Sequence, residues 1–535
     1  MKNFDLFDNS LFLPSWRERF RLSEIVPRIV LALFVIGLIF AYTLLTHGDP
    51  NNQYHVLSSW QSAFIFALAV FQGYVLLFFG TMSAYSAASR EISGGMLDFH
   101  RVSPTALAQL ALGLWLGATS VEWLIGGGLL LLELGVVIMN VALSPDSLGS
   151  LRGVVGFNAA LVCCAVLYQI FGVLAGLLNC PRRRASSAFV FAVLVYFLSH
   201  FLMVMEGSFT YYLTWFPAYR YLSSSLAGTG SSDFLFINAG APVGQLYGWE
   251  IPFLLMQLLI QGPFIVFMFR VVKRRIALPE HPLMQKLESL ALIGVILFYC
   301  VGSIVSPLSG DTDSTGLPSR EVPWGIMVYV LTLLGYIGVA VATPSYLFFM
   351  KGWKRAKKLG RKAPDGWGDY SSNLMWLLGF SGLVAVTLTA CGLIFEFSFF
   401  QGTLFGVFIL SFPWFLGQLL EYFNLSRPRR SRIIMFVVLL TLWFFIPLLG
   451  YSIAIPWSEP EPVFFLQYCL APSPIFGLVK VILALSGDLE GDSILGMTAF
   501  NIALIGLVSF LARQQRRRIR SDIVARDDGA ALENS

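Results

Sequence analysis

The sequence has little charge. Charged residues make up 13% of its 535 residues and hydrophobic residues 56%, whereas soluble domains average about 25% and roughly 45–50%. Segments such as 61–82 and 433–452 hold about 20 residues without Lys, Arg, Asp or Glu, which is the length that crosses a hydrocarbon core roughly 30 Å thick. The composition therefore excludes an ordinary soluble protein and predicts a membrane protein.

Catalytic and nucleotide-binding motifs are also missing. The chain has no G-x-x-x-x-G-K-[ST] loop, no HExxH pair and no dinucleotide glycine fingerprint. Its six cysteines follow no metal-ligand spacing such as CxxC, and we interpret them as small packing residues. We expect a protein that is not itself an enzyme, with no metal site and no cofactor bound by this chain.

Apolar segments alternate with basic connections along the whole chain. Twelve spans are predicted, at 28–46, 59–82, 110–142, 153–178, 186–205, 250–270, 288–306, 324–350, 373–395, 402–423, 433–452 and 493–512. When the connections are sorted by side, 32 of the 36 Lys and Arg residues fall on the side that holds both termini. Because cytoplasmic loops are enriched in Lys and Arg, both termini are predicted to be cytoplasmic. This topology explains the basic clusters, so we expect no nucleic-acid partner.

The two halves of the chain have the same order of predicted spans and connections. In each half a fifth span is followed by a long outer segment, 206–249 or 453–492, and then by a sixth span that ends in a basic run. We predict an all-α polytopic protein made of two six-span units, arranged as follows: an amphipathic interfacial helix in 1–27, a first unit at 28–275, a second unit at 276–512, and a cytoplasmic tail at 513–535.

The first cytoplasmic connection carries an unusual pattern. "SREISGGMLDFHRVSPTALAQLALG", from Ser89, continues the second span, breaks it at Gly94-Gly95, and allows a short helix before Ser103-Pro104 opens the next one. Proline suits the first helical turn and serine the cap before it. A short helix between glycines on the inner face is a structure that another subunit can bind.

This stretch resembles the permease subunits of type-2 ABC exporters. The match rests on Arg90-Glu91, Gly94-Gly95, Leu97-Asp98 and Ser103-Pro104, with Arg101 between them, while Met96 and Thr105 depart from the usual Thr and Leu. The resemblance implies that residues 90–104 form a coupling helix, which docks on a cytoplasmic P-loop ATPase. It also implies that ATP and Mg²⁺ bind to that separate subunit, in two copies. The expected location is the inner membrane of a bacterial cell.

The matching connection of the second half lacks the Arg-Glu and Ser-Pro pairs of this pattern. "KGWKRAKKLGRKAPDGWGDYSSN", from Lys351, contains Lys354, Arg355, Lys358 and Arg361. This basic loop has two interpretations, a second coupling helix or a contact with anionic membrane lipids, to which each basic residue contributes about 1 kcal/mol.

Two acidic residues lie inside the third span. Glu122 and Glu133 are eleven residues apart, close to three helical turns, so they share one face about 16 Å apart. Such residues are costly in a membrane and should face the bundle interior. They could form a polar track for substrate or hydrogen bonds between helices.

Two other classes of protein fit part of this pattern. An ion-coupled secondary transporter would also favour twelve spans in two halves, with Glu122 and Glu133 on the ion path. A membrane-embedded transferase for lipid or glycan precursors would need a catalytic carboxylate or a basic cluster on an outer loop. Only four basic residues are expected on the outer side, Arg152, Arg220, Arg320 and Lys480, which argues against binding of a diphosphate there. Neither the substrate nor the direction of transport is predicted by the sequence.

Overall fold

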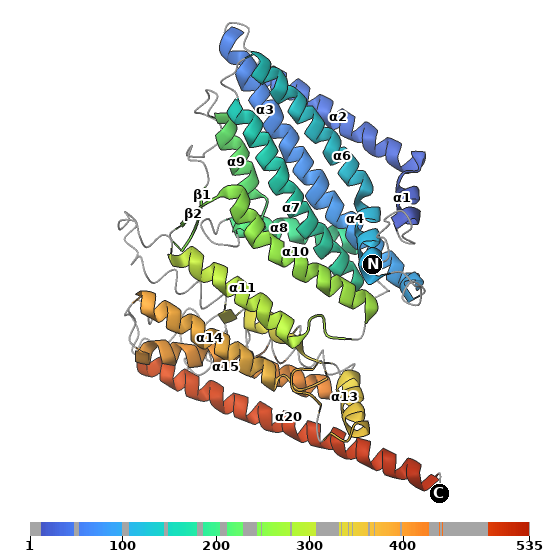
Figure 1. The fold of residues 1–535 in the computed structure, drawn as a ribbon, viewed down its shortest axis with the longest axis vertical. Coiled ribbons are helices and arrows are strands. Elements are labelled where there is room, and N and C mark those ends of the chain that lie inside the picture. Colours follow the sequence, from blue (N-terminus) through green and yellow to red (C-terminus); the bar gives the residue numbers. More distant parts are fainter. Residues whose placement is uncertain are drawn as a thin grey trace, which may run out of the picture. The chain divides into compact units, whose positions relative to one another are not determined.

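A computed structural model describes most of the chain as helix (Figure 1). The described residues are 12–47, 53–98, 106–143, 148–178, 186–203, 211–227, 243–278 without 248, 281–305, 331–395 without 333, 341, 345, 362–363 and 369, 399–426, 438, 441 and 491–533. The chain divides into two compact units, Met1–Pro279 and Glu280–Ser535.

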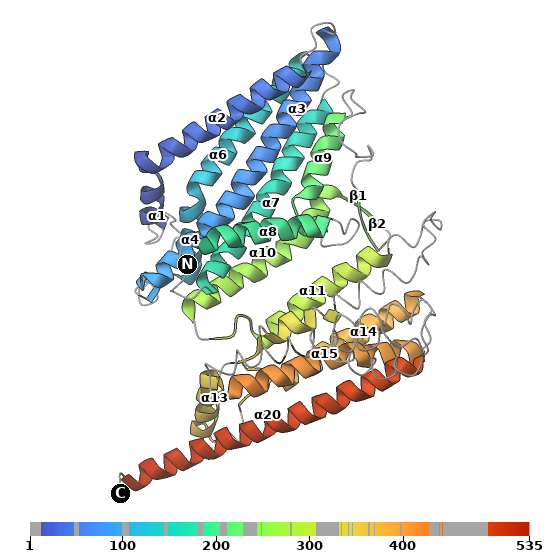
Figure 2. The same ribbon diagram turned by 180° about the vertical axis from the view of Figure 1, so that it is seen from behind.

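The first unit is built from long apolar helices. They are α1 (Phe12–Arg19), α2 (Leu22–His47), α3 (Gln53–Gly73), α4 (Gly80–Ser93), α6 (Leu107–Leu143), α7 (Leu148–Leu178), α8 (Ser186–Met203), α9 (Phe216–Ala227) and α10 (Phe253–Ala277). A π-helical turn, η1 (Tyr74–Phe79), joins α3 to α4, and a 3₁₀ turn, η3 (Tyr211–Leu213), precedes α9. Within this unit α2, α3, α6 and α7 lie side by side (Figures 1 and 2). Helices suit a membrane because all of their backbone polar groups pair within one segment.

The segment before α10 departs from an all-helical chain. Strands β1 (Val243–Leu246) and β2 (Trp249–Pro252) form an antiparallel pair with Val243 opposite Pro252. This small hairpin lies at the end of the long outer segment predicted at 206–249 and extends into the first residues of the span predicted at 250–270. Pro252 then precedes the first residue of α10, a position where its missing N–H costs nothing.

Helix α9 belongs to that same outer segment and is packed into the first unit. Ala218 and Leu222 are fully buried, and the Tyr219 hydroxyl donates to the carbonyl of Ala69 at 2.5 Å. The helix is too short to cross a membrane at 12 residues. It therefore packs against α3 and α7 without crossing the membrane alongside them.

Figure 1 labels five helices in the described part of the second unit. They are α11 (Lys286–Val305), α13 (Tyr346–Lys358), α14 (Leu374–Phe395), α15 (Phe399–Leu425) and α20 (Gly491–Glu533). The buried core of this unit is centred on Trp376, which donates its indole N–H to Ser289 at 2.7 Å and stacks on Phe380. Lys286, at the start of α11, is 1% exposed and donates to the carbonyls of Ser371 and Ser372.

Seven helices of the described part are long and apolar enough to cross a membrane: Leu22–Leu45, Trp60–Ser93, Leu107–Ala142, Ser150–Leu178, Phe253–Ala277, Gly406–Leu425 and Met497–Ser521. Two shorter apolar helices, Ser187–Phe197 and Leu374–Ala390, fall where spans are also predicted. The prediction of a helical multi-pass membrane protein is confirmed. The predicted span at 433–452, apart from residues 438 and 441, lies outside the described residues, and so do the first seven residues of the one predicted at 324–350.

Helix α2 has an extensive exposed apolar face. Large apolar side chains cover its outer side, among them Leu33 and Phe34, each 62% exposed. An exposed apolar face of this extent is stable only in contact with hydrocarbon or with another protein. We therefore expect acyl chains to contact this face of α2.

Candidate functional site

The predicted break after the second span is present. Helix α4 ends at Ser93, the Gly94 amide donates to the Arg90 carbonyl at 2.8 Å, and the Asp98 amide donates to the Gly95 carbonyl at 3.2 Å. Gly95 has φ 68°, a left-handed conformation that glycine adopts without steric cost. The chain thus turns sharply at Gly95 and forms a short helical turn over 96–98.

This turn, which we call the hook (residues 94–98), presents both exposed and anchored side chains. Gly94, Gly95, Met96 and Asp98 are exposed, whereas Leu97 is only 2% exposed. Leu97 therefore fixes the turn to the helices while its neighbours face outward. Arg101, Ser103 and Pro104, the remaining predicted coupling residues, lie outside the described residues.

Residues just before the hook connect it to α1. Arg90 is exposed and forms an ion pair with Glu18 at 3.7 Å, while Glu91 is half-buried. An exposed pair of this kind contributes little stability, about 0–1 kcal/mol. The ion pair matters for position more than for stability, because it joins the end of α4 to the amphipathic helix α1.

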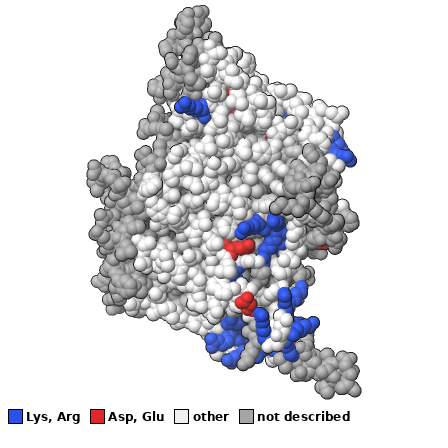
Figure 3. Space-filling model, in the orientation of Figure 1, with Lys and Arg blue, Asp and Glu red and all other residues white. Residues whose placement is uncertain are grey.

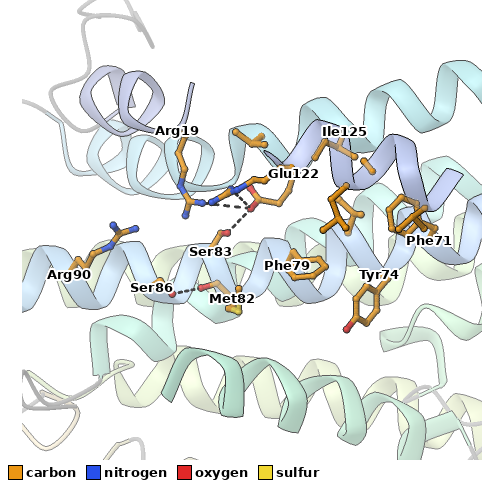
Figure 4. A pocket seen from close by; sticks show the side chains of 16 residues that line it. Arg19, Phe71, Tyr74, Phe79, Met82, Ser83, Ser86, Arg90, Glu122 and Ile125 are labelled. Atoms are coloured by element: carbon orange, nitrogen blue, oxygen red, sulfur yellow. Dashed lines mark hydrogen bonds and ion pairs between the residues drawn. The ribbon is translucent and has the colours of Figure 1, made fainter. Parts of the chain in front are cut away.

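Glu122 is the centre of a buried charged cluster. The Ser83 hydroxyl of α4 donates to Glu122 Oε1 at 2.6 Å, and the same oxygen lies 3.4 Å from Arg28 of α2 and 3.8 Å from Arg19 of α1 (Figure 4). Glu122 is 5% exposed. One carboxylate of α6 therefore holds three other helices.

The Arg19 guanidinium depends on this carboxylate. Burial lowers the pKa of Arg19 below its ordinary value, and the neighbouring Glu122 charge opposes that shift. Taking a guanidinium out of water is costly unless an opposite charge accompanies it. Glu122 supplies that charge, so its burial is explained by the arginines beside it.

A cavity of about 530 Å³ opens beside the Glu122 cluster. Its lining includes Arg19 and Arg90 on one side and Phe71 and Tyr74 on the other (Figure 4). Arg28, which also lines it, meets the same Glu122 oxygen as Arg19 and so belongs to the basic side. The volume lies within the roughly 300–1,000 Å³ that is usual for ligand pockets. All of its lining residues belong to the first unit.

Glu133 belongs to a separate polar network. Its Oε2 accepts a hydrogen bond from Asn158 at 2.9 Å, and Asn158 in turn accepts one from Gln72 at 2.8 Å. Glu133 is fully buried, and its Oε1 has no hydrogen-bond partner among the described residues. Both predicted acidic residues thus face the interior, but they contact different side chains of the described bundle and form no shared track there.

Gln169 is a polar hub that the sequence does not single out. Its Oε1 accepts from the indole N–H groups of Trp115 and Trp123 at 2.9 and 3.0 Å, and its Nε2 donates to the Leu76 carbonyl at 3.0 Å. That carbonyl belongs to the π-helical turn η1, where regular helical pairing is interrupted. A lone glutamine in the apolar run "VLYQIFG" was the only signal for it.

Close approach of α4 and α7 depends on two glycines four residues apart. A Cβ at Gly172 would lie 2.7 Å from the Thr81 carbonyl oxygen, and one at Gly176 would lie 2.5 Å from that of Tyr85. The G-x-x-x-G spacing, which permits such contacts between membrane helices, is legible in "GVLAG".

The basic loop of the second unit is a capped surface helix. Lys354, Arg355, Lys358 and Arg361 are all exposed. Helix α13 ends at Lys358 and is followed by a left-handed glycine, Gly360 with φ 66°, and the Arg361 amide donates back to the Ala356 carbonyl at 2.8 Å. The two described glycines with positive φ, Gly95 and Gly360, thus occupy corresponding connections of the two units.

Helix α13 leaves its charge on one side. Phe349 is buried with Leu425 and Ile519, and Arg520 lies 5.5 Å from the Trp353 ring. Figure 3 shows the basic side chains gathered over α13 and the adjoining part of α20. This surface suits either anionic headgroups or an acidic protein surface.

Comparisons with protein-family models, curated proteins and solved structures found no match to this chain. Among the described residues, no group of three or more His, Cys, Asp or Glu side chains could hold a metal ion.

Proposed function

We propose that the chain is the permease subunit of an ATP-driven exporter, and that a separate P-loop ATPase drives it by binding the hook. The observation that carries this proposal is that a membrane-spanning helix leads directly into the hook. Trp60–Ser93 is one apolar helical segment, and it ends in an exposed turn formed by glycine. A force applied to the hook is therefore applied to a membrane-spanning helix.

Contacts along α4 provide the route for that force. Arg90 pairs with α1, Ser83 bonds to Glu122 of α6, and the closely approached Gly176 fits α7 against α4. The rise from Ser83 to the end of α4 at Ser93 is about 15 Å. A tilt of α4 would accordingly displace α1, α6 and α7 with it, because packed interfaces shift between discrete arrangements instead of deforming continuously.

The energy must come from outside this chain. The sequence of 535 residues contains no phosphate-binding G-x-x-x-x-G-K-[ST] loop, which a transport ATPase needs to cradle the phosphates of ATP. ATP and Mg²⁺ are accordingly assigned to the partner, in two copies. The exposed basic helix α13 would meet the second copy or the lipid surface.

Ion-coupled transport is the second candidate. The observation that favours it is the buried Glu133 carboxyl group, whose Oε1 has no partner among the described residues. Acidic residues inside transporters often mark ion paths. A chain that moves solute on an ion gradient alone, without an ATPase, would establish this alternative.

Co-purification tests the docking step. The full chain is co-expressed with a P-loop ATPase encoded next to its gene, and the amount of ATPase retained is measured for the variant Met96→Glu/Asp98→Lys. Both side chains are exposed, so the fold should tolerate the changes. We expect retention to fall about tenfold or more, since central interface residues contribute about 2 kcal/mol or more each.

The matched control changes two exposed residues of the predicted outer side, Arg152→Glu and Trp249→Glu. We expect the control to retain the ATPase as the wild type does. Equal retention by the hook variant and the wild type would contradict the assignment.

A further inference from the structure

The cavity beside Glu122 has the polarity of an amphiphile. Three guanidinium groups, from Arg19, Arg28 and Arg90, line one end, and the aromatic and aliphatic side chains of Phe71, Tyr74 and Ile125 line the other. Figure 4 shows Arg19 and Arg90 on the side opposite Phe71 and Tyr74. A ligand that fills this cavity must therefore be anionic at one end and apolar at the other.

The charge balance at the polar end favours an anion. Glu122 is the one acidic residue that lines the cavity against three arginines. Two carboxylates that do not line the cavity, Glu18 and Glu24, pair with Arg90 and Arg28, but these acids are 61% and 54% exposed. Exposed pairs are weak, whereas guanidinium binds phosphate oxygens in bidentate, charge-assisted geometry. A phosphate group can therefore replace Glu18 and Glu24 as the partner of these arginines.

Access and length also fit a lipid. Leu31, which lines the cavity, is 59% exposed and lies on the apolar outer side of α2. Along α4 and η1, the rise from Arg90 to Phe79 is about 16 Å, which spans the distance from a headgroup to well inside a bilayer leaflet. The cavity is thus open toward hydrocarbon and has its basic end at the predicted cytoplasmic surface.

We propose that this cavity binds an anionic phospholipid, with the phosphate held by Arg28, Arg90 and Arg19 and an acyl chain laid against Phe79, Tyr74 and Phe71. A free phosphate would leave the apolar end without a ligand. Every lining residue belongs to the first unit of this chain, so lipid binding can be measured on the chain alone and its failure can be distinguished from a failure of ATPase docking.

Native mass spectrometry of the delipidated full chain tests the site. Phosphatidylglycerol and phosphatidylcholine of the same acyl composition are titrated separately, and inorganic phosphate is the competing probe. We expect the wild type to bind one phosphatidylglycerol at least tenfold more tightly than phosphatidylcholine. The variant Arg28→Gln/Arg90→Gln should lose about tenfold or more of that affinity.

Two further variants separate this site from diffuse charge effects. Arg152→Gln/Arg518→Gln removes two exposed arginines outside the cavity and should bind phosphatidylglycerol as the wild type does. Ala32→Phe keeps every charge and fills the cavity from a residue that is 8% exposed, so it should lose the same affinity as the double arginine variant. Equal binding of the two lipids, an equal loss in the outer control, or displacement of the lipid by equimolar inorganic phosphate would each overturn the proposal.

Discussion

Gly176→Leu is expected to unfold or aggregate the first unit. A Cβ at this position would lie 2.5 Å from the Tyr85 carbonyl oxygen and 2.8 Å from Ala88 Cβ, and backbone atoms cannot move aside as a flexible side chain can. Overpacking of this kind costs about 3 kcal/mol or more. The result should be a fall of roughly 10 °C in the melting temperature, or loss of the monodisperse peak, in fluorescence-detected size-exclusion chromatography of the detergent-solubilised chain.

Gly128→Leu is the matched control. It makes the same substitution within α6, where an added Cβ meets nothing within 4 Å. Because leucine favours helices more than glycine does, this variant should melt at or above the wild-type temperature. If Gly176→Leu has the same melting temperature as the Gly128→Leu control, helices α4 and α7 do not approach each other closely at Gly176.

Glu122→Ala is expected to destabilise the first unit strongly. It removes the carboxylate that faces Arg19, whose side chain is 12% exposed, and leaves the Ser83 hydroxyl without its acceptor. Removing one partner of a buried ion pair costs about 3–5 kcal/mol because the other charge stays buried. The expected measurement is a melting temperature lowered by roughly 10 °C, with the wild type and Glu24→Ala run in parallel.

Glu24→Ala removes the same charge from Arg28 at the surface. Glu24 is 54% exposed, so its loss should cost below about 1 kcal/mol. A double variant, Arg19→Met/Glu122→Met, replaces the pair with apolar groups of similar size and should recover most of the lost stability. A double variant no more stable than Glu122→Ala would mean that the charge pair is not the source of the effect.

Hydropathy predicts most of the described helices and few of their ends. The span predicted at 110–142 is the helix Leu107–Leu143, and the one predicted at 153–178 is Leu148–Leu178. Helix α2 begins at Leu22 instead of 28. Its first turns contain Glu24, Pro27 and Arg28, which raise the polarity of the window without breaking the helix.

Features set by tertiary contacts could not be predicted. The hairpin of β1 and β2 gives no apolar signal, and the π-helical turn η1 has an ordinary helical sequence, "YVLLFF". The partners of Glu122 come from Arg19 and Arg28, about a hundred residues earlier in the chain. One sequence can show that a buried carboxylate needs a partner, but not which arginine supplies it.

Some features of the candidate site could be predicted from the sequence because they depend on neighbouring residues in the chain. The pair Gly94-Gly95 in a polar connection predicts a turn, and the left-handed φ of Gly95 is its physical reason. The basic residues of α13 lie on an exposed side of the helix, while Phe349 is buried on the other side.

The central claim is that the hook receives work from a separate ATPase, and the ATP hydrolysis rate of that ATPase tests it most directly. The rate is measured in proteoliposomes with the wild-type chain and with Gly95→Val, which strains the left-handed turn at φ 68°. We predict that the wild type changes the rate of the ATPase several-fold, and that Gly95→Val abolishes this change while the chain remains folded. The result that would contradict the account is an equal rate of ATP hydrolysis in all three conditions: the ATPase by itself, the ATPase with the wild-type chain, and the ATPase with Gly95→Val.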